Sequence, residues 1–418
     1  MREMKDSGIE WVGIIPSNWI IHPVYYYFGE RKNKNKFGQE DNLLSLSYGK
    51  IIRKDINTSE GLLPESFNTY NIAEKGDIVI RPTDLQNDKR SLRTGLVRER
   101  GIITSAYICL KPIKDIDSRF FNYQLHSYDV IKVFYNMGNG VRQGLNFSEF
   151  SHLLVFEPPL GEQKRIADYL DAKCAEIDAL AADIQAQIDT LEQYKRSVIT
   201  EAVTKGLDPD VEMKDSGIFY MAPMNAAWRL TKIGYICTKL SRSFNSEDTA
   251  LICSNQGKVL VRPDNVTGIM VSEDNAMQGI HKGDIAIHGM DTWHGAIALS
   301  NYDGKITRVV HVCDSTENKR FIVYYLQHLA FQGVYKLISN GVRGNTSDFR
   351  SWDKVCDIYI AIPTSKGEQK AICDYLDMLC SHVDEIVAQK KDQLSTLEAY
   401  KKSLIYEYVT GKKEVPAQ

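Results

Sequence analysis

One segment occurs twice in this chain, and the repeat constrains the fold more than any other feature of the sequence. Residues 161–204 align without a gap on residues 367–410, with 23 identical residues in 44 positions. A second repeat, Met-Lys-Asp-Ser-Gly-Ile, begins at Met4 and again at Met213. Repeats at a nearly fixed offset indicate duplication of a structural unit. We therefore expect two copies of one unit.

Length and charge exclude several classes of protein. A chain of 418 residues can form two or three domains with full cores. Its 51 Lys and Arg against 54 Asp and Glu give a net charge of -3, so no global positive field marks a nonspecific nucleic-acid binder. We find no signal segment and no apolar run of about 18 residues, which predicts a cytoplasmic protein without membrane contact. The cysteines and histidines show no metal-ligand spacing, so we expect reduced thiols and no bound metal.

The long repeated segment has the seven-residue apolar period of a coiled-coil helix. Lys195 and Lys401 stand at matching positions of the two seams. A polar seam residue can fix the register of paired helices, or its ammonium can extend into water at a frayed helix end, and both interpretations remain open. The predicted apolar seam residues are Leu170, Ile177, Ile184, Leu191, Val198, Leu376, Val383, Leu397 and Leu404.

Two globular stretches, residues 10–157 and 219–363, flank these helices and are called the first and second head below. Lys-Gly-Asp-Ile-Val-Ile at 75–80 matches Lys-Gly-Asp-Ile-Ala-Ile at 282–287, each typical of a turn that enters a short strand. Residues 119–133 and 320–334 share helix-like spacing, and both segments lead to Asn-Gly-Val-Arg. Each head is therefore predicted to be an α+β domain. The expected domains are 1–157, 158–206, 207–363 and 364–418.

The order of the repeats predicts a circular arrangement. The first long helix leads into Met-Lys-Asp-Ser-Gly-Ile at Met213, whereas the second helix ends at the C-terminus and its matching hexapeptide is at Met4. We therefore expect neighbouring termini, a pseudo-two-fold relation between the copies, and two long helices paired as an antiparallel coiled coil. About 38 helical residues span at most roughly 57 Å, so heads reaching inward would be separated by about one turn of DNA.

Local basic runs are compatible with DNA, although such a run is also typical of a solvated face. One run comprises Arg31, Lys32, Lys34 and Lys36, and a second lies at Lys89, Arg90, Arg93, Arg98 and Arg100. The second head has only scattered cations with the pair Trp293 and His294. The candidate DNA-binding residues are Arg31, Lys32, Lys34, Lys36, Arg81, Lys89, Arg90, Arg93, Arg142, Gln143, Arg242, Arg262, Trp293, His294, Arg343 and Asn345.

Over its whole length the chain resembles the specificity (S) subunit of type I restriction-modification systems. The resemblance rests on MKDSGIEWVGIIPSNW, on PPLGEQKRIADYLD and IPTSKGEQKAICDYLD, and on LEQYKRSVITEAVTKG and LEAYKKSLIYEYVTGK. It implies two target-recognition domains that each read half of a split sequence in double-stranded DNA. It also implies helices that set the gap and bind two modification (M) subunits. The second copy, MKDSGIFYMAPMNAAW, lacks Ile-Pro-Ser, which leaves open whether its entry turn matches the first.

The resemblance further implies that chemistry belongs to partners. In the family, M subunits use S-adenosylmethionine to methylate adenine, and restriction (R) subunits use ATP and magnesium. We find no Asn-Pro-Pro-aromatic tetrapeptide, no G-x-G-x-x-G cradle and no P-loop in this chain, so we expect no catalysis and no cofactor here. Two alternatives remain open: an enzyme that joins restriction and methyl transfer, and a coiled-coil adaptor without DNA specificity.

Overall fold

The computed structural model describes residues 2–57, 66–83, 85, 92–137, 144–263, 274–339 and 349–416. The chain forms two compact units. The first contains residues 1–184 and 392–418, and the second contains residues 185–391. Each unit thus contains one head together with parts of both long helices, α4 (Leu160–Thr204) and α9 (Lys366–Val409), which are called the helix pair below.

The first head is built from short strands around one central helix. Its four-stranded sheets follow the orders β6-β5-β10-β7 and β4-β11-β8-β9, and two further two-stranded sheets are the hairpin β1-β2 and the long-range pair β12-β3. The apolar run 102–110 divides at a turn into two strands, β10 and β11. The strands are β1 (Met4–Asp6), β2 (Ile14–Pro16), β3 (Ile20–Pro23), β4 (Phe28–Glu30), β5 (Leu43–Ser47), β6 (Lys50–Lys54), β7 (Asn71–Ala73), β8 (Ile78–Ile80), β9 (Thr94–Leu96), β10 (Gly101–Ile103), β11 (Ile108–Pro112) and β12 (Leu154–Glu157). The helices are α1 (Val24–Tyr27), η1 (Lys36–Gly38), η2 (Phe67–Thr69), α2 (Ser118–Val130), η3 (Val133–Asn136) and α3 (Phe147–Phe150).

The second head repeats one four-stranded sheet of the first, whereas its strands β17-β18 and β19-β22 form two separate two-stranded sheets in place of β6-β5-β10-β7. Its sheet β16-β23-β20-β21 has the same order of equivalent strands as β4-β11-β8-β9, and β15-β24 corresponds to β3-β12. The strands are β13 (Met213–Lys214), β14 (Met224–Asn225), β15 (Arg229–Lys232), β16 (Cys237–Lys239), β17 (Leu251–Ser254), β18 (Lys258–Val261), β19 (Met277–Ile280), β20 (Ile285–His288), β21 (Ile297–Leu299), β22 (Gly304–Thr307), β23 (Val310–Ser315) and β24 (Tyr359–Ile362). The helices are α5 (Ile233–Ile236), η4 (Asp274–Ala276), η5 (Thr292–His294), α6 (Lys319–Phe331), α7 (Val334–Ile338) and α8 (Trp352–Cys356).

The entry turns of the two copies match despite their different sequences. Met4 pairs with Pro16 across β1 and β2, and Met213 pairs with Asn225 across β13 and β14. Both pairs have the same spacing along the chain. The loss of Ile-Pro-Ser in the second copy therefore leaves the register of the entry hairpin unchanged.

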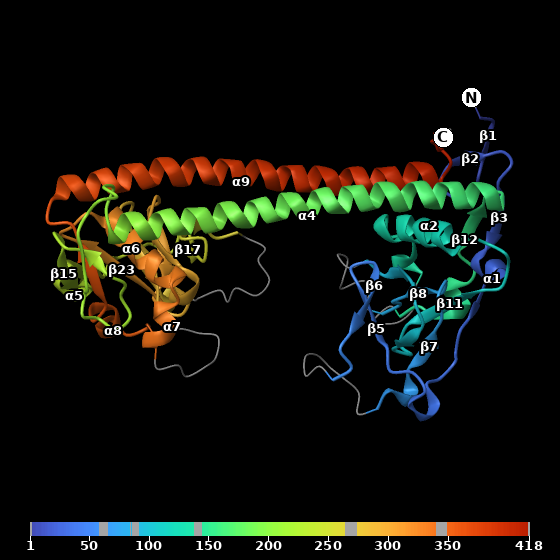
Figure 1. Cartoon of the computed structure of the whole chain (residues 1–418), viewed down its shortest axis with the longest axis horizontal. Coiled ribbons are helices and arrows are strands. Elements are labelled where there is room, and N and C mark those ends of the chain that lie inside the picture. The colour runs from blue at the N-terminus through green and yellow to red at the C-terminus, as the bar shows by residue number, and fades with distance from the viewer. Residues whose placement is uncertain are drawn as a thin grey trace. The chain divides into compact units, whose positions relative to one another are not determined.

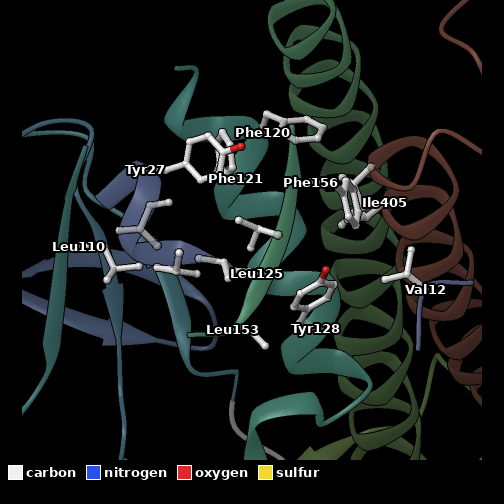
Figure 2. Packing of buried hydrophobic residues seen from close by; sticks show 14 of the residues in the cluster. Val12, Tyr27, Leu110, Phe120, Phe121, Leu125, Tyr128, Leu153, Phe156 and Ile405 are labelled. Atoms are coloured by element: carbon white, nitrogen blue, oxygen red, sulfur yellow. The ribbon is translucent and has the colours of Figure 1, made fainter. Parts of the chain in front are cut away.

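The central helix of each head packs between its sheet and the helix pair. Phe120, Phe121, Leu125 and Tyr128 of α2 are fully buried in the core of the first unit, and Ile405 of α9 joins the same cluster. Figure 2 shows these side chains between the strands and the long helices. An apolar cluster around α6 performs the same role in the second unit.

The long helices pair antiparallel within each unit. In the first unit Tyr408 lies beside Tyr169, with 4.5 Å between ring centres, and in the second unit Lys390 donates to Gln187 of the other helix. Most predicted seam residues are buried, whereas Leu191, Val198 and Leu397 are half-buried. The N- and C-terminal segments are neighbours, as the circular arrangement predicted, and Tyr406 donates to the carbonyls of Trp11 and Val12 (Figure 1).

Candidate nucleic-acid interface of each head

The Lys-Gly-Asp motif is a structural turn in both heads. Gly76 and Gly283 adopt positive φ angles of 95° and 88°, which favour glycine because they require the left-handed region. The buried carboxylate of Asp77 accepts the backbone N–H of Glu74 at 2.9 Å, and that of Asp284 accepts the backbone N–H of His281 at 2.8 Å. The motif therefore closes a turn and sets the start of β8 or β20.

Two predicted DNA-binding arginines are bound to these carboxylates. Arg31 contacts Asp77 through Nε at 2.5 Å and Nη2 at 3.0 Å, and Arg242 contacts Asp284 at 2.6 and 2.8 Å. Burial lowers the pKa of Arg31, but the hydrogen bond and charge of Asp77 outweigh burial and raise it overall. Such fork-shaped pairs hold both groups firmly. These guanidinium groups are therefore engaged with their own heads.

The loop that follows β8 or β20 meets the same neighbouring segment in both heads. We call this loop, residues 81–83 and 85 in the first head and 289–295 in the second, the post-KGD loop. Leu145 donates its N–H to the carbonyl of Pro82 at 3.0 Å, and Phe349 donates to the carbonyl of Gly289 at 3.0 Å. Pro82 and Gly289 each stand five residues after the motif aspartate. The structure thus brings each post-KGD loop to the chain that follows Asn-Gly-Val-Arg.

Arg93 lies behind the first post-KGD loop, and its prediction as a DNA contact needs correction. Its side chain is fully buried and donates to the carbonyl of Thr83 and, at 2.9 Å, to Tyr135. The backbone N–H of Arg93 donates to buried Asp129. Because the guanidinium faces the protein interior, Arg93 supports the loop from within. A run of cations in sequence did not distinguish this residue from its exposed neighbours.

The second post-KGD loop presents an aromatic and a histidine side chain. Trp293 is half-buried, Lys336 of α7 lies 5.7 Å from its ring centre, and its Nε1 has no hydrogen-bond partner in the described structure. His294 beside it is exposed. Ring faces of tryptophan and neighbouring cations suit contact with nucleobases and phosphates.

The other predicted cations differ in their surroundings. Lys32 pairs with Glu30 at 2.7 Å, and Lys34 donates to the carbonyl of Thr69 at 2.9 Å. Among the residues that the structure describes, the side chains of Lys36 and Arg262 have no ion-pair partner, and Arg81 and Arg262 are half-buried. The predictions for Lys89, Arg90, Arg142, Gln143, Arg343 and Asn345 lie outside the described residues.

Four aspartates on the helix pair contact the central helices of the heads, and sequence reasoning did not single them out. Arg119 of α2 binds Asp168 at 2.7 Å and Asp171 at 3.1 Å, and it also binds Asp117, which precedes its own helix. In the second unit Arg320 of α6 binds the equivalent Asp374 and Asp377. The signal was available, because both aspartate pairs are identical between the repeated segments.

The seam lysines form ion pairs between the two helices. Lys401 contacts Asp178 at 2.5 Å, and Lys195 contacts Asp384 at 2.6 Å. Both lysine side chains are about a quarter exposed. These pairs favour the interpretation that the lysines fix helix register over the interpretation that they only extend into water.

Two kinds of feature are absent from the residues that the structure describes. No group of three His, Cys, Asp or Glu residues there could hold a metal ion. No described helix is both long and apolar enough to cross a membrane. The candidate site of each head is the surface around its post-KGD loop and the segment bonded to that loop. The fold defines a two-headed protein built by internal duplication.

Comparisons with known proteins agree with this class. Residues 28–190 match the family model of the type I restriction modification DNA specificity domain. The chain is 23% identical to a type I restriction enzyme MjaX specificity subunit of Methanocaldococcus jannaschii, over 96% of this chain and 95% of that protein. A chain from a solved structure of a type I R-M system has 13% identity and a TM-score of 0.65, covering 96% of this chain and 99% of that one, which shows a shared fold. The HsdS subunit from Thermoanaerobacter tengcongensis has 13% identity and a TM-score of 0.46, covering 98% of this chain and 100% of that one. Residues 28–190 are therefore similar to the type I restriction modification DNA specificity domain, and the chain as a whole is similar in sequence to a specificity subunit.

Proposed function

We propose that the chain is the sequence-specific DNA-recognition subunit of a type I restriction-modification complex. Each head reads one half of a bipartite, asymmetric target in double-stranded DNA. The matched hydrogen bonds of Leu145 to Pro82 and of Phe349 to Gly289 carry this proposal. Within each head, the bond joins the post-KGD loop to the segment that follows Asn-Gly-Val-Arg. The loops themselves differ, with Arg81 in the first head and Trp293 with His294 in the second. A shared frame with different loops suits two different half-sites.

The helix pair sets the gap between the half-sites and binds two M subunits. Support comes from the seam, where the buried apolar residues and the two ion pairs of Lys195 and Lys401 specify one register. M subunits supply S-adenosylmethionine chemistry, and R subunits supply ATP- and magnesium-dependent steps. The chain itself performs no catalysis and binds no cofactor. Purified alone, it neither methylates nor cuts DNA.

The test exchanges one head. Residues 219–363 are replaced by the corresponding head of another family member, and the complex with M subunits is used to methylate a genomic DNA library. We expect one half of the methylated sequence to change and the other half to stay the same. If the chain is an adaptor without DNA specificity, the exchange leaves the methylated sequence unaltered. A change in both halves would contradict the division of labour between the heads.

A second test changes the helices. Four residues are inserted after Ala186 in α4, and four are inserted at the matching place after Asp392 in α9. About 6 Å are added to each helix, so the preferred gap should lengthen while both half-sites stay unchanged. An active complex with its original gap would contradict the proposed role of the helix pair.

A further inference from the structure

One aspartate in each unit binds two lysines from different parts of the fold. Asp178 of α4 binds Lys401 of α9 at 2.5 Å and Lys50 of the first head at 3.0 Å. In the second unit, Asp384 of α9 binds Lys195 of α4 at 2.6 Å and Lys258 of the second head at 3.3 Å. Both sites therefore join the two helices to a head through a single carboxylate.

The head lysine occupies the same kind of turn in both copies. Lys50 begins β6 directly after Gly49, and Lys258 begins β18 directly after Gly257. The two glycines adopt positive φ angles of 77° and 69°, although the hairpins close at different lengths, with Ser47 paired to Lys50 and Ser254 paired to Lys258. The Gly-Lys pair is thus present in both hairpins although the loops differ in length.

Each glycine turn also abuts the strand that follows the post-KGD loop. A Cβ at Gly49 would lie 3.2 Å from Cβ of Leu92 and 3.6 Å from the carbonyl oxygen of Thr94, the first residue of β9. A Cβ at Gly257 would lie 3.5 Å from the carbonyl oxygen of Ile297, the first residue of β21. In each unit, the helix aspartate thus binds the head lysine, and the glycine turn before that lysine lies against the strand that follows the post-KGD loop.

The exposed fractions of the paired aspartate and lysine side chains indicate that these ion pairs orient the head more than they stabilise the fold. The side chains of Asp178 and Asp384 are 41% and 40% exposed, and those of Lys50 and Lys258 are 68% and 56% exposed. Ion pairs this exposed contribute little to folding. Burial raises the pKa of Asp178, but its hydrogen bonds to Lys401 and Lys50 outweigh burial and lower it overall; the same balance holds for Asp384 with Lys195 and Lys258. Both carboxylates therefore remain charged and able to hold two cations near neutral pH.

We propose that Asp178 and Asp384 are positioning residues that fix how each head is rotated on its part of the helix pair. The inference rests on the proposed function, because the consequence of a rotated head is a less precise gap between half-sites. Lys50 and Lys258 act through these aspartates and hold the post-KGD loops at one orientation. A groove of about 950 Å³ lies beside the second site, lined by Lys195, Lys258, Asp384 and Arg320. The hairpin borders this groove on one side, and Gln327 of α6 donates to the carbonyl of Gly257 at 3.4 Å.

The experiment measures gap precision directly. Complexes with M subunits carry Asp178→Asn, Asp384→Asn, Lys50→Gln or Lys258→Gln, and methylation rates are compared on targets with the preferred gap and with one base pair more or less. We expect discrimination against the wrong gaps to fall about 2- to 5-fold in each variant, the range that one partly exposed ion pair supplies. The half-site sequences and the melting temperature should stay as in the wild type. Lys54→Gln is the matched control, an exposed lysine at the other end of β6, and should leave gap discrimination unchanged.

A second readout does not depend on methylation. Spin labels are placed on the hairpin at Tyr48 and on α4 at Ala182, both in the first unit, and the distance distribution is measured in the free full-length chain. Asp178→Asn and Lys50→Gln should broaden the distribution, whereas Lys54→Gln should not. Unchanged distributions together with unchanged gap discrimination would overturn the inference. A wild-type complex that methylates no defined sequence would instead refute the proposed function, and the distance measurement would still decide the role of Asp178.

Discussion

Arg119 of α2 and Asp168 of α4 lie 2.7 Å apart and join the first head to the helix pair. The same guanidinium reaches Asp171 and Asp117, so three carboxylates converge on one cation whose side chain is 32% exposed. The hydrogen bonds that Arg119 donates to these three carboxylates raise its pKa well above the ordinary value, and the bond to Asp117 contributes most. Removing the cation would leave three anions facing one another.

Arg119→Ala is therefore expected to destabilise the first unit by about 1 to 3 kcal/mol. Arg320→Ala should act in the same direction on the second unit, where Asp377 loses its ion-pair partner while Asp374 keeps Lys370. Urea unfolding of each full-length variant measures the change. Lys173→Ala, which removes an exposed pair with Glu176 within α4, is the control and should leave the free energy of unfolding nearly unchanged. Equal effects of Lys173→Ala and Arg119→Ala would contradict this reasoning.

Arg93→Met tests whether a predicted DNA contact is a structural residue. The guanidinium donates to Thr83 and Tyr135 in the core, so its loss should reduce the free energy of unfolding by about 2 to 4 kcal/mol. Lys36→Ala, at an exposed lysine, should change stability by less than about 0.5 kcal/mol. The measurement is urea unfolding of the full-length chain. An Arg93→Met variant with wild-type stability and weakened DNA binding by the assembled complex would restore the original interpretation.

The long helices and the relation between the heads could be predicted from the sequence, whereas the roles of residues such as Arg93 could not. Heptad spacing predicted both long helices, because a seam is a local pattern that recurs many times, and α4 lies within the expected segment 158–206. The matched heads were predicted from short repeats such as Lys-Gly-Asp, and the sheets β4-β11-β8-β9 and β16-β23-β20-β21, which contain this motif's strands, have the same order.

Local sequence patterns could not predict the roles of individual cations. Arg31 meets Asp77 only because strands 46 residues apart along the chain lie together, and Arg93 is buried by a similar long-range contact with Tyr135. A run of charge contains no information about which carboxylate will fold beside it. Asp178 and Asp384 did have a signal, since both aspartates and both seam lysines are identical between the repeats. That signal identifies the residues but not the head lysines that they bind.

One half-buried histidine, His126, and one buried histidine, His328, predict loss of stability in mild acid. Burial, with Lys401, Lys402 and Lys132 nearby, lowers the pKa of His126 to about 4, and burial also lowers the pKa of His328 to about 4. An unfolded histidine titrates near 6.5, so between these values the unfolded state binds more protons. The stabilising contribution is therefore complete above about pH 6.5 and declines as the pH falls toward 4.

His126→Gln should remove part of this pH dependence. Gln327 occupies the equivalent position of α6, so the second copy already contains glutamine there. Relative to its value at pH 7.5, the wild type should lose up to about 2 kcal/mol more than the variant at pH 5 in the unfolding of the first unit. Urea unfolding at both pH values is the measurement. His382→Gln, at an exposed position of α9, should keep the wild-type pH dependence. If His126→Gln also keeps it, the imidazole of His126 is not the group that titrates.

Arg142 and Arg343 of the two Asn-Gly-Val-Arg motifs remain candidates for phosphate contacts that both heads share. The motifs lie outside the described residues, but the chain that follows each of them bonds to a post-KGD loop through Leu145 or Phe349. A phosphate contact at equivalent places would explain why the motif is common to heads that read different bases. An arginine that caps the end of a helix would also be common to both heads, because the preceding helices are related.

Alanine at either position separates these two roles. A phosphate contact predicts that DNA binding by the assembled complex weakens by about 1 to 3 kcal/mol and that the slope of log affinity against log salt falls by about one, with the same sequence preference. A capping role predicts a lower melting temperature with an unaltered salt slope. Affinity is therefore measured across a salt series for Arg142→Ala, Arg343→Ala and Lys54→Ala, the last as an exposed lysine outside the motif, alongside the melting temperature of each free chain. Because the two motifs are equivalent, Arg142→Ala and Arg343→Ala should give the same change in slope, and a change confined to one head would show that the motif serves a different purpose in each.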